Sequence, residues 1–204
     1  MIKLRLEPRI LAGQDAMSAV VYTPHRVKLS VDDFHKLGDA GILASDARVE
    51  LIEGDLIEMA PIGGPHIGIV NRLTRLLVVA VGDLGVVSIQ NPVTLPPRSE
   101  PQPDIAVLKP GIDGSSAGVP QSVDALLVIE VADSTLAYDR DTKVPLYARA
   151  GIPEVWVVDV NARRLLVHRT PGPTGYADVR EISTGVVAVE ALPTVSIRVD
   201  DIFS

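Results

Sequence analysis

Residues 125–133 read ALLVIEVAD. Five apolar residues lead directly into Glu130, and such an uninterrupted run predicts a strand that is buried on both faces. A carboxylate at the end of a buried strand costs free energy unless it is paired, hydrogen-bonded or bound to a metal. Glu130 is therefore a candidate site residue, although a strand-end glutamate that reaches solvent or pairs with an arginine would leave the same pattern.

The segments around this strand alternate between helical and extended patterns. Strands are expected at 47–60 (two short strands joined at Gly54-Asp55), 85–90, 104–108, 154–159 and 163–169. Helices are expected at 30–44 after Ser30, from Pro65 along an apolar stripe to Val81, and at about 140–150 before Gly151. Weaker strands and a last turn at 200–203 follow. The pattern predicts an α/β (α+β) fold with a mixed β-sheet core flanked by helices.

Length and composition suit one globular domain. The chain has 204 residues, of which 47% are hydrophobic and 3% aromatic, so aliphatic side chains must fill the core. We expect a single domain at 26–204 after a weakly patterned extension at 1–25, in which Met17 is an alternative start. The chain has no cysteine, which excludes disulfides and thiolate sites and fits a cytoplasmic location. No apolar stretch is long enough for a signal peptide or a membrane span.

The formal net charge of −7 counts against a broad basic surface of the kind that coats nucleic acid. It leaves room for an enzyme that binds nucleic acid locally. A carboxylate site that recruits a divalent cation makes its own region acidic when no cation is bound.

Two further carboxylates lie at predicted strands. Asp104 follows Pro103 and enters the apolar strand IAVL, and Glu50 lies in the strand-like segment RVELIEGD. Each has an ordinary alternative: Asp104 as a turn residue after proline, and Glu50 as a solvent-facing strand residue.

Lys143 is the candidate cation of this set. It lies just after the Glu130 strand, near the predicted start of a helix, where a lysine opposes the helix dipole and adds no helix stability. A solvated surface lysine is the ordinary alternative. Two carboxylates on neighbouring strands can bind Mg²⁺ through oxygen ligands, and a nearby lysine can stabilise developing charge on a phosphate.

Several segments together resemble a known family. VELIEGDLIEM, PQPDIAVL, VIEVADST, YDRDTKVPLYARAGIPEVWVVD and the final VDDIF are similar to the "Uma two" family of proposed restriction endonucleases, within the PD-(D/E)XK nuclease superfamily. The resemblance covers about residues 28–203, in the same order along the chain. Each segment alone would be a weak signal.

The resemblance implies a restriction-endonuclease-like fold and a Mg²⁺-dependent cleavage of DNA, with Mn²⁺ as a substitute. It implies that Asp104 and Glu130 are the two motif acids, that these acids and the Val131 carbonyl hold the metal, and that Glu50 corresponds to the preceding acid. The superfamily motif has lysine two residues after the second acid, but this chain has Ala132 there. The lysine of this family lies on the following helix, which implicates Lys143. A homodimer is a further expectation from the resemblance.

Three more residues are auxiliary candidates. His66 at the start of the second helix has the chemistry to bind metal or phosphate, but a satisfied helix-terminal histidine is the simpler interpretation. Gln102 precedes the Asp104 strand, and Tyr147 lies four residues after Lys143 on the same helical face.

The function has alternatives that the residues leave open. The missing lysine of the motif and the acidic balance also fit a catalytically inactive module that serves in binding or assembly. RNA or a small nucleotide is not excluded as substrate, because the chain has no aromatic stacking platform and no base-reading helix. A partner protein cannot be identified from one chain.

Overall fold

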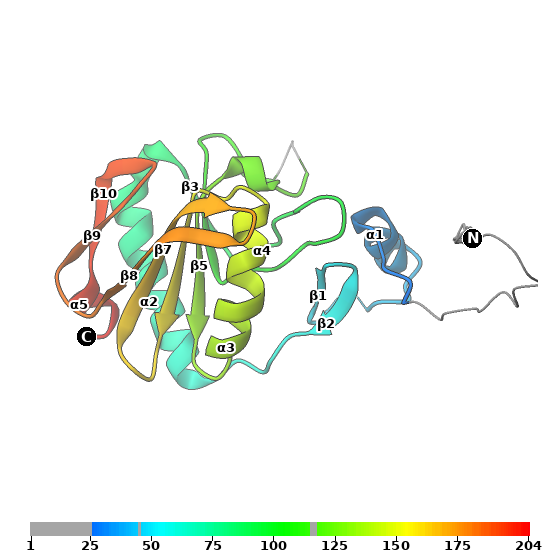
Figure 1. Ribbon diagram of the computed structural model, residues 1–204, viewed down its shortest axis with the longest axis horizontal. Helices are drawn as coiled ribbons and strands as arrows, with labels where there is room; N and C mark the ends of the chain where they lie inside the picture. The colour runs from blue at the N-terminus through cyan, green and yellow to red at the C-terminus, as the bar shows by residue number, and fades with distance from the viewer. Residues whose placement is uncertain (1–25, 45, 115–117) are drawn as a thin grey trace, which may run out of the picture.

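The computed structural model describes residues 26–44, 46–114 and 118–204; the expected extension at 1–25 lies outside them. Its centre is a six-stranded sheet with the strand order β3-β4-β5-β6-β7-β8 (Figure 1). The strands are β3 (Val86–Ile89), β4 (Ile105–Leu108), β5 (Ala125–Ala132), β6 (Glu154–Asp159), β7 (Arg164–Gly172) and β8 (Gly175–Ile182). All neighbours are antiparallel except β5 and β6, which are parallel. The expected mixed sheet is confirmed.

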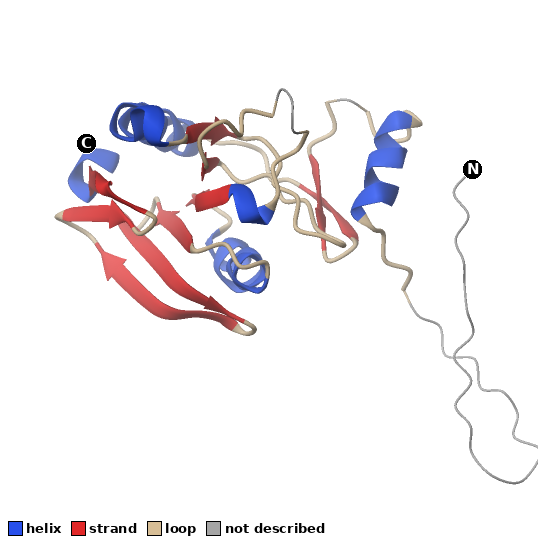
Figure 2. Ribbon diagram, turned by 90° about the horizontal axis from the view of Figure 1, so that it is seen from above, coloured by secondary structure: helices blue, strands red, loops and turns tan. Residues whose placement is uncertain are grey.

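Helices cover both faces of the sheet (Figure 2). A parallel pair of strands needs a long crossover, and β5 is joined to β6 by a continuous helical run. This run comprises α3 (Leu136–Tyr138), a π-helical turn (Asp139–Lys143) and α4 (Val144–Arg149). Side chains of α4 pack with Val128 and Val155 on one face, whereas α2 (Gly64–Val81) packs with Ile129 and Trp156 on the other. The alternation follows from the two-residue period of a strand.

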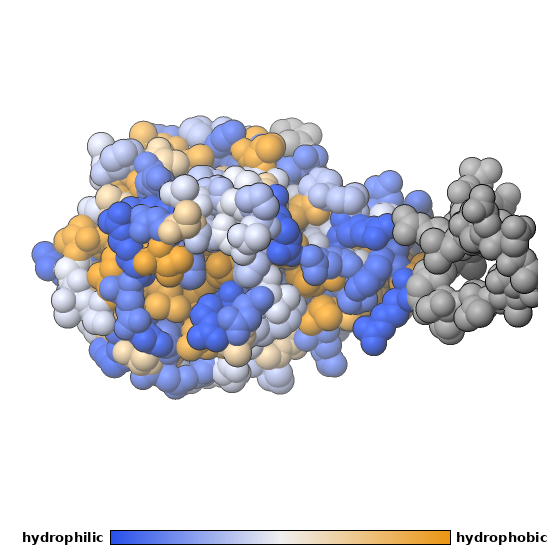
Figure 3. Space-filling view, viewed as in Figure 1, coloured by the Kyte–Doolittle hydropathy of each residue, from blue (hydrophilic) through white to orange (hydrophobic). Residues whose placement is uncertain are grey.

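Two smaller units complete the fold. The hairpin of β9 (Val186–Val189) and β10 (Leu192–Arg198), with α5 (Val199–Ile202), joins α2 in one core cluster. At the other side of the molecule lie α1 (Val31–Asp39) and the hairpin of β1 (Val49–Ile52) and β2 (Asp55–Glu58) (Figures 1 and 2). On the face seen in Figure 3, hydrophilic residues cover most of this side. Short 3₁₀ turns lie at Gly82–Leu84 and Ser122–Asp124.

The bounds of two helices differ from those expected. The helix expected at 30–44 ends at Asp39. The Gly41 N–H bonds the Gly38 carbonyl at 2.8 Å and the Ile42 N–H bonds the Leu37 carbonyl at 2.9 Å, with Gly41 at φ +68°. This pair of bonds around a left-handed glycine is the Schellman motif that terminates helices.

The helix expected at 140–150 begins earlier, at Leu136. Pro145 lies in the first turn of α4, where proline is common, but the helical run extends back through the π turn to Leu136. Within the described part of the chain, none of the helices combines the length and the apolar character that crossing a membrane would need.

A buried carboxylate ties the β9–β10 hairpin to the sheet. Glu154 on β6 is fully buried and accepts from Trp156 Nε1 at 2.7 Å and from Arg169 Nε at 2.8 Å. Its second oxygen accepts from the backbone N–H of Glu190 at 2.7 Å, between β9 and β10. A buried charge is tolerated because each of its oxygens has donors.

Replacement of this carboxylate should therefore destabilise the chain. Glu154→Ala leaves the charge of the largely buried Arg169 guanidinium without its buried carboxylate and the indole N–H of Trp156 without its acceptor. We expect a loss of about 3–5 kcal/mol in the free energy of unfolding. Glu190→Gln, at the exposed edge of the same cluster, should change it by no more than about 0.5 kcal/mol. Urea unfolding measures both. Similar losses in the two variants would contradict this role of Glu154.

Candidate active site

A cleft of about 260 Å³ lies between the β1–β2 hairpin, the ends of β4 and β5 and the π turn. The residues expected at the site that line it are Glu50, His66, Gln102, Asp104, Glu130, Val131 and Lys143. Tyr147 is fully buried behind the cleft. The chain thus brings together residues from segments far apart in sequence; their catalytic roles remain predictions.

The sheet register brings the two motif acids together. Ile105 pairs with Ile129 across antiparallel strands, so Asp104, one residue earlier, lies beside Glu130. Asp104 Oδ2 accepts from the backbone N–H of Val131 at 2.8 Å. This bond fixes the Asp104 carboxylate against the end of β5.

Lys143 is buried between two carboxylates. Its Nζ lies 3.0 Å from Glu50 Oε2 and 3.2 Å from Glu130 Oε1, and its side chain is 6% exposed. Burial on its own would lower the pKa of Lys143, but Glu130 and Glu50 together raise it above the ordinary lysine value. Lys143 therefore carries a positive charge throughout the neutral pH range. The ordinary alternative of a solvated surface lysine is excluded.

The π turn that carries Lys143 was not predicted from the sequence. The Val144 N–H bonds the Asp139 carbonyl, five residues back instead of four. A proline in a helix cannot donate to the carbonyl four residues before it and clashes with that carbonyl. Pro145 lies two residues after the end of the π turn, with Val144 between them, so the widened turn accommodates it. Such turns are frequent at functional sites.

Glu130 is the most perturbed acid of the cleft. Its Oε1 accepts from the Tyr147 hydroxyl at 2.6 Å. Burial raises the pKa of Glu130 to about 8; Lys143 and Tyr147 oppose this rise, and Asp139 and Asp104 add to it. The Tyr147 hydroxyl thus holds the Glu130 side chain from the buried side of the cleft. Tyr147 lies four residues after Lys143, so both side chains can reach Glu130.

Glu50 faces the cleft and not solvent, being only 3% exposed. Besides Lys143, its Oε2 accepts from the backbone N–H of Gln102 at 3.2 Å and its Oε1 from the Tyr138 hydroxyl at 3.3 Å. Its strand belongs to the separate β1–β2 hairpin, so Lys143 ties this hairpin to β5. The Gln102 side chain points elsewhere, to the Gln90 carbonyl.

His66 lies against Asp104 and the end of β5. Its Nδ1 is 2.9 Å from the Val131 carbonyl oxygen and its Nε2 is 2.9 Å from Asp104 Oδ1. The Asp104 carboxylate raises the pKa of His66, against the effect of burial. His66 is thus not a helix-terminal residue satisfied by its own helix; it reaches across to the two groups expected to hold a metal.

Sequence reasoning missed two residues of the cleft, Tyr138 and Asp139. Asp139 is 4% exposed, accepts from Thr135 Oγ1 at 2.5 Å, and burial raises its pKa. The segment YDRD looks like a solvated helix start with acids in its first turn. In the structure Asp139 is buried and Asp141 is exposed. The sequence does not show which of the two acids faces the cleft, because that depends on the π turn.

The donor set fits a hard cation that keeps much of its water. Asp104, Glu130 and the Val131 carbonyl supply oxygen atoms only, as Mg²⁺ prefers, and Mg²⁺ is usually held by one or two carboxylates plus water. Across residues 26–44, 46–114 and 118–204, no three histidine or acidic side chains are grouped to hold an ion by themselves. Water would therefore complete the coordination.

The raised pKa of Glu130 predicts a pH-dependent stability. In the folded chain Glu130 keeps its proton to about pH 8, whereas its ordinary pKa is 4.5. Its contribution to the free energy of unfolding is therefore fully present below the ordinary value and is lost as pH rises through the folded value. Glu130→Gln cannot titrate, so between about pH 5 and pH 9, in EDTA, the variant should gain stability relative to the parent. Urea unfolding at each pH measures the difference; a constant difference would contradict the raised pKa.

Comparison with known proteins agrees with this fold. The model of the Uma2 family, described as "Putative restriction endonuclease", matches residues 31–200. A solved structure from Anabaena variabilis ATCC 29413, titled a "putative nuclease belonging to DUF820", superposes with a TM-score of 0.68 at 18% sequence identity, covering 86% of this chain and 97% of that chain. At that identity the likeness shows the fold alone. A search of curated proteins finds no match. The chain belongs to the Uma2 family, whose description is that of a "putative restriction endonuclease".

Proposed function

We propose that this chain is a divalent-cation-dependent endonuclease that hydrolyses DNA phosphodiester bonds. The observation that carries the proposal is the buried Lys143 ammonium, held by Glu50 and Glu130 in the same cleft as Asp104. DNA as substrate follows from the family description as a restriction endonuclease. The expected homodimer, the cytoplasmic location and the preference for DNA over RNA remain predictions.

The charge of the cleft supports a need for a cation. Acidic side chains outnumber basic ones in its lining. The basic side chains are Arg48, His66 and Lys143, and the acids are Glu50, Glu58, Asp104, Glu130, Asp133 and Asp139. A phosphodiester is an anion, so this cleft repels it until positive charge is added. Asp104 and Glu130 would hold Mg²⁺, or Mn²⁺ in its place. The ion polarises a phosphate oxygen and acidifies a bound water.

The residues of the chain have separate tasks around that ion. Lys143, charged at neutral pH, stabilises the negative charge that develops on the phosphate. Glu50 and Glu130 hold Lys143 in place, because its ammonium lies 3.0 Å from a Glu50 oxygen and 3.2 Å from a Glu130 oxygen. Tyr147 fixes Glu130 from behind, and the Val131 N–H fixes Asp104. Most of the site is therefore oriented before substrate binds, which reduces the reorganisation needed during reaction.

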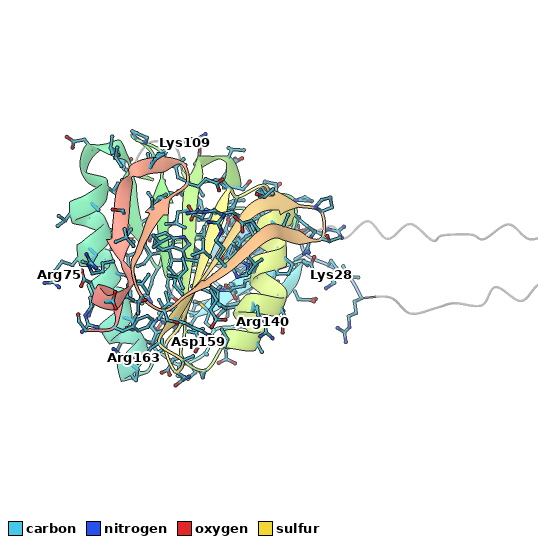
Figure 4. The ribbon with its side chains drawn as sticks, turned by 60° about the vertical axis from the view of Figure 1, so that its left-hand side comes forward. Lys28, Arg75, Lys109, Arg140, Asp159 and Arg163 are labelled. Carbon is cyan, nitrogen blue, oxygen red and sulfur yellow. The ribbon has the colours of Figure 1, made fainter. Side chains whose placement is uncertain are left out.

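Cleavage of supercoiled plasmid tests the proposal. The parent chain should cut DNA with Mg²⁺ or Mn²⁺ and not with EDTA. Glu130→Gln and Lys143→Met should each lower the rate by about 100-fold or more, because the first removes an acid that holds the ion and the second removes the cation beside the reacting phosphate. Lys109→Met is the matched control. Lys109 directly follows β4, at the opposite end of that strand from Asp104. In Figure 4 it lies far from Asp159, which marks the other end of the sheet.

Thermal unfolding of each variant separates loss of activity from loss of fold. Full activity in Lys143→Met would exclude Lys143 from the reaction. Absence of cleavage by the parent chain with any divalent cation would favour the alternative of an inactive module that serves in binding or assembly. A parallel assay with single-stranded RNA distinguishes an RNA-cutting enzyme from a DNA-cutting one.

A further inference from the structure

His66 has a defined tautomer in its contact with β5. Its Nδ1 lies 2.9 Å from the Val131 carbonyl oxygen. A carbonyl oxygen only accepts hydrogen bonds, so Nδ1 carries a hydrogen and donates it. In the neutral ring the other nitrogen, Nε2, then presents a lone pair.

That second nitrogen faces a carboxylate without a hydrogen bond. Nε2 is buried and has no hydrogen-bond partner among the described residues, although Asp104 Oδ1 lies only 2.9 Å from it. The two atoms are close but not aligned for a hydrogen bond. Adjacent ligands of an octahedral ion with bonds of about 2.1 Å lie about 3.0 Å apart. The spacing of Nε2 and Oδ1 is that of two such ligands.

The contact of Nδ1 supports the same interpretation. A histidine that binds a metal generally donates its other ring N–H to a backbone carbonyl or a carboxylate, which fixes the ring and its tautomer. The Val131 carbonyl occupies that role here. Because Nδ1 and Nε2 point away from one another across the ring, an ion at Nε2 lies on the side of the ring away from this carbonyl oxygen.

We propose that His66 Nε2 and Asp104 Oδ1 are neighbouring ligands of the divalent cation, and that the Val131 carbonyl orients His66 and is not itself a ligand. This inference rests on the proposed function, since it assumes a cation at Asp104. Imidazole suits transition metals, whereas Mg²⁺ prefers oxygen. The site should therefore favour Mn²⁺ over Mg²⁺.

Electron spin echo spectroscopy of the full chain with Mn²⁺ tests the proposal directly, because it detects a nitrogen bonded to the ion. The parent chain should show the imidazole coupling. His66→Asn places an amide near the position of Nδ1 and so can still donate to Val131, but it removes Nε2. This variant should lose the coupling, and its affinity for Mn²⁺, measured by calorimetry, should fall by about 100-fold. The preference for Mn²⁺ over Mg²⁺ should fall with it.

Two further variants serve as controls. His35→Asn removes a half-exposed histidine that also contacts a carboxylate, Glu100, and should leave the coupling and the affinity unchanged. His66→Gln places an amide oxygen near the position of Nε2; it should lose the nitrogen coupling but retain part of the affinity, and it replaces His66→Asn if that variant does not fold.

The outcomes separate this inference from the proposed function. Mn²⁺ binding without imidazole coupling in the parent chain, or coupling that persists in the folded His66 variants, would overturn the assignment of His66 while leaving a metal site in place. Absence of Mn²⁺ and Mg²⁺ binding by the parent chain would overturn the proposed function and this inference with it.

Discussion

The buried charge of Lys143 is the constraint on which the site depends. A lysine ammonium removed from water needs counter-charges or polar acceptors close by. The chain supplies them from two separate units: the Glu50 carboxylate on the β1–β2 hairpin, and Glu130 on β5, whose Oε1 lies 3.2 Å from the ammonium. The π turn sets the position of Lys143 on its helix. One cation thereby ties the hairpin, the sheet and the crossover helix together around the cleft. Because the same three elements line the cleft, the interaction that holds the site in shape is also its proposed source of positive charge.

Much of the fold could be predicted from apolar periodicity. The run before Glu130, the stripe of α2 and the strand EVWVVD are long and regular, and the structure confirms each as an element. Helix bounds were less predictable, because the Schellman motif at Gly41 and the π turn before Pro145 depend on local backbone geometry and not on a periodic pattern. The acids were identified as candidates because a carboxylate in an apolar strand is unusual. Tyr138 and Asp139 were missed, since nothing in YDRD distinguishes a buried acid from a solvated one.

The family match and the fold agree with each other, but the chemistry has to be argued from the residues of the site. The Uma2 match covers residues 31–200, and the chain shares its fold with a structure titled a "putative nuclease". A fold by itself does not specify an activity. Here the site adds independent physical arguments: an acidic cleft that repels phosphate, an ion-paired lysine, and a histidine whose contacts resemble those of a metal ligand. A net charge of −7 is compatible with these, because the added cation supplies the local positive charge.

The most direct test of a cation-dependent site is anomalous diffraction from a crystal of this chain soaked in Mn²⁺. We expect a peak within bonding distance of an Asp104 oxygen, inside the cleft that Lys143 lines. A crystal that binds Mn²⁺ only elsewhere, or that shows no peak in the cleft, would contradict it.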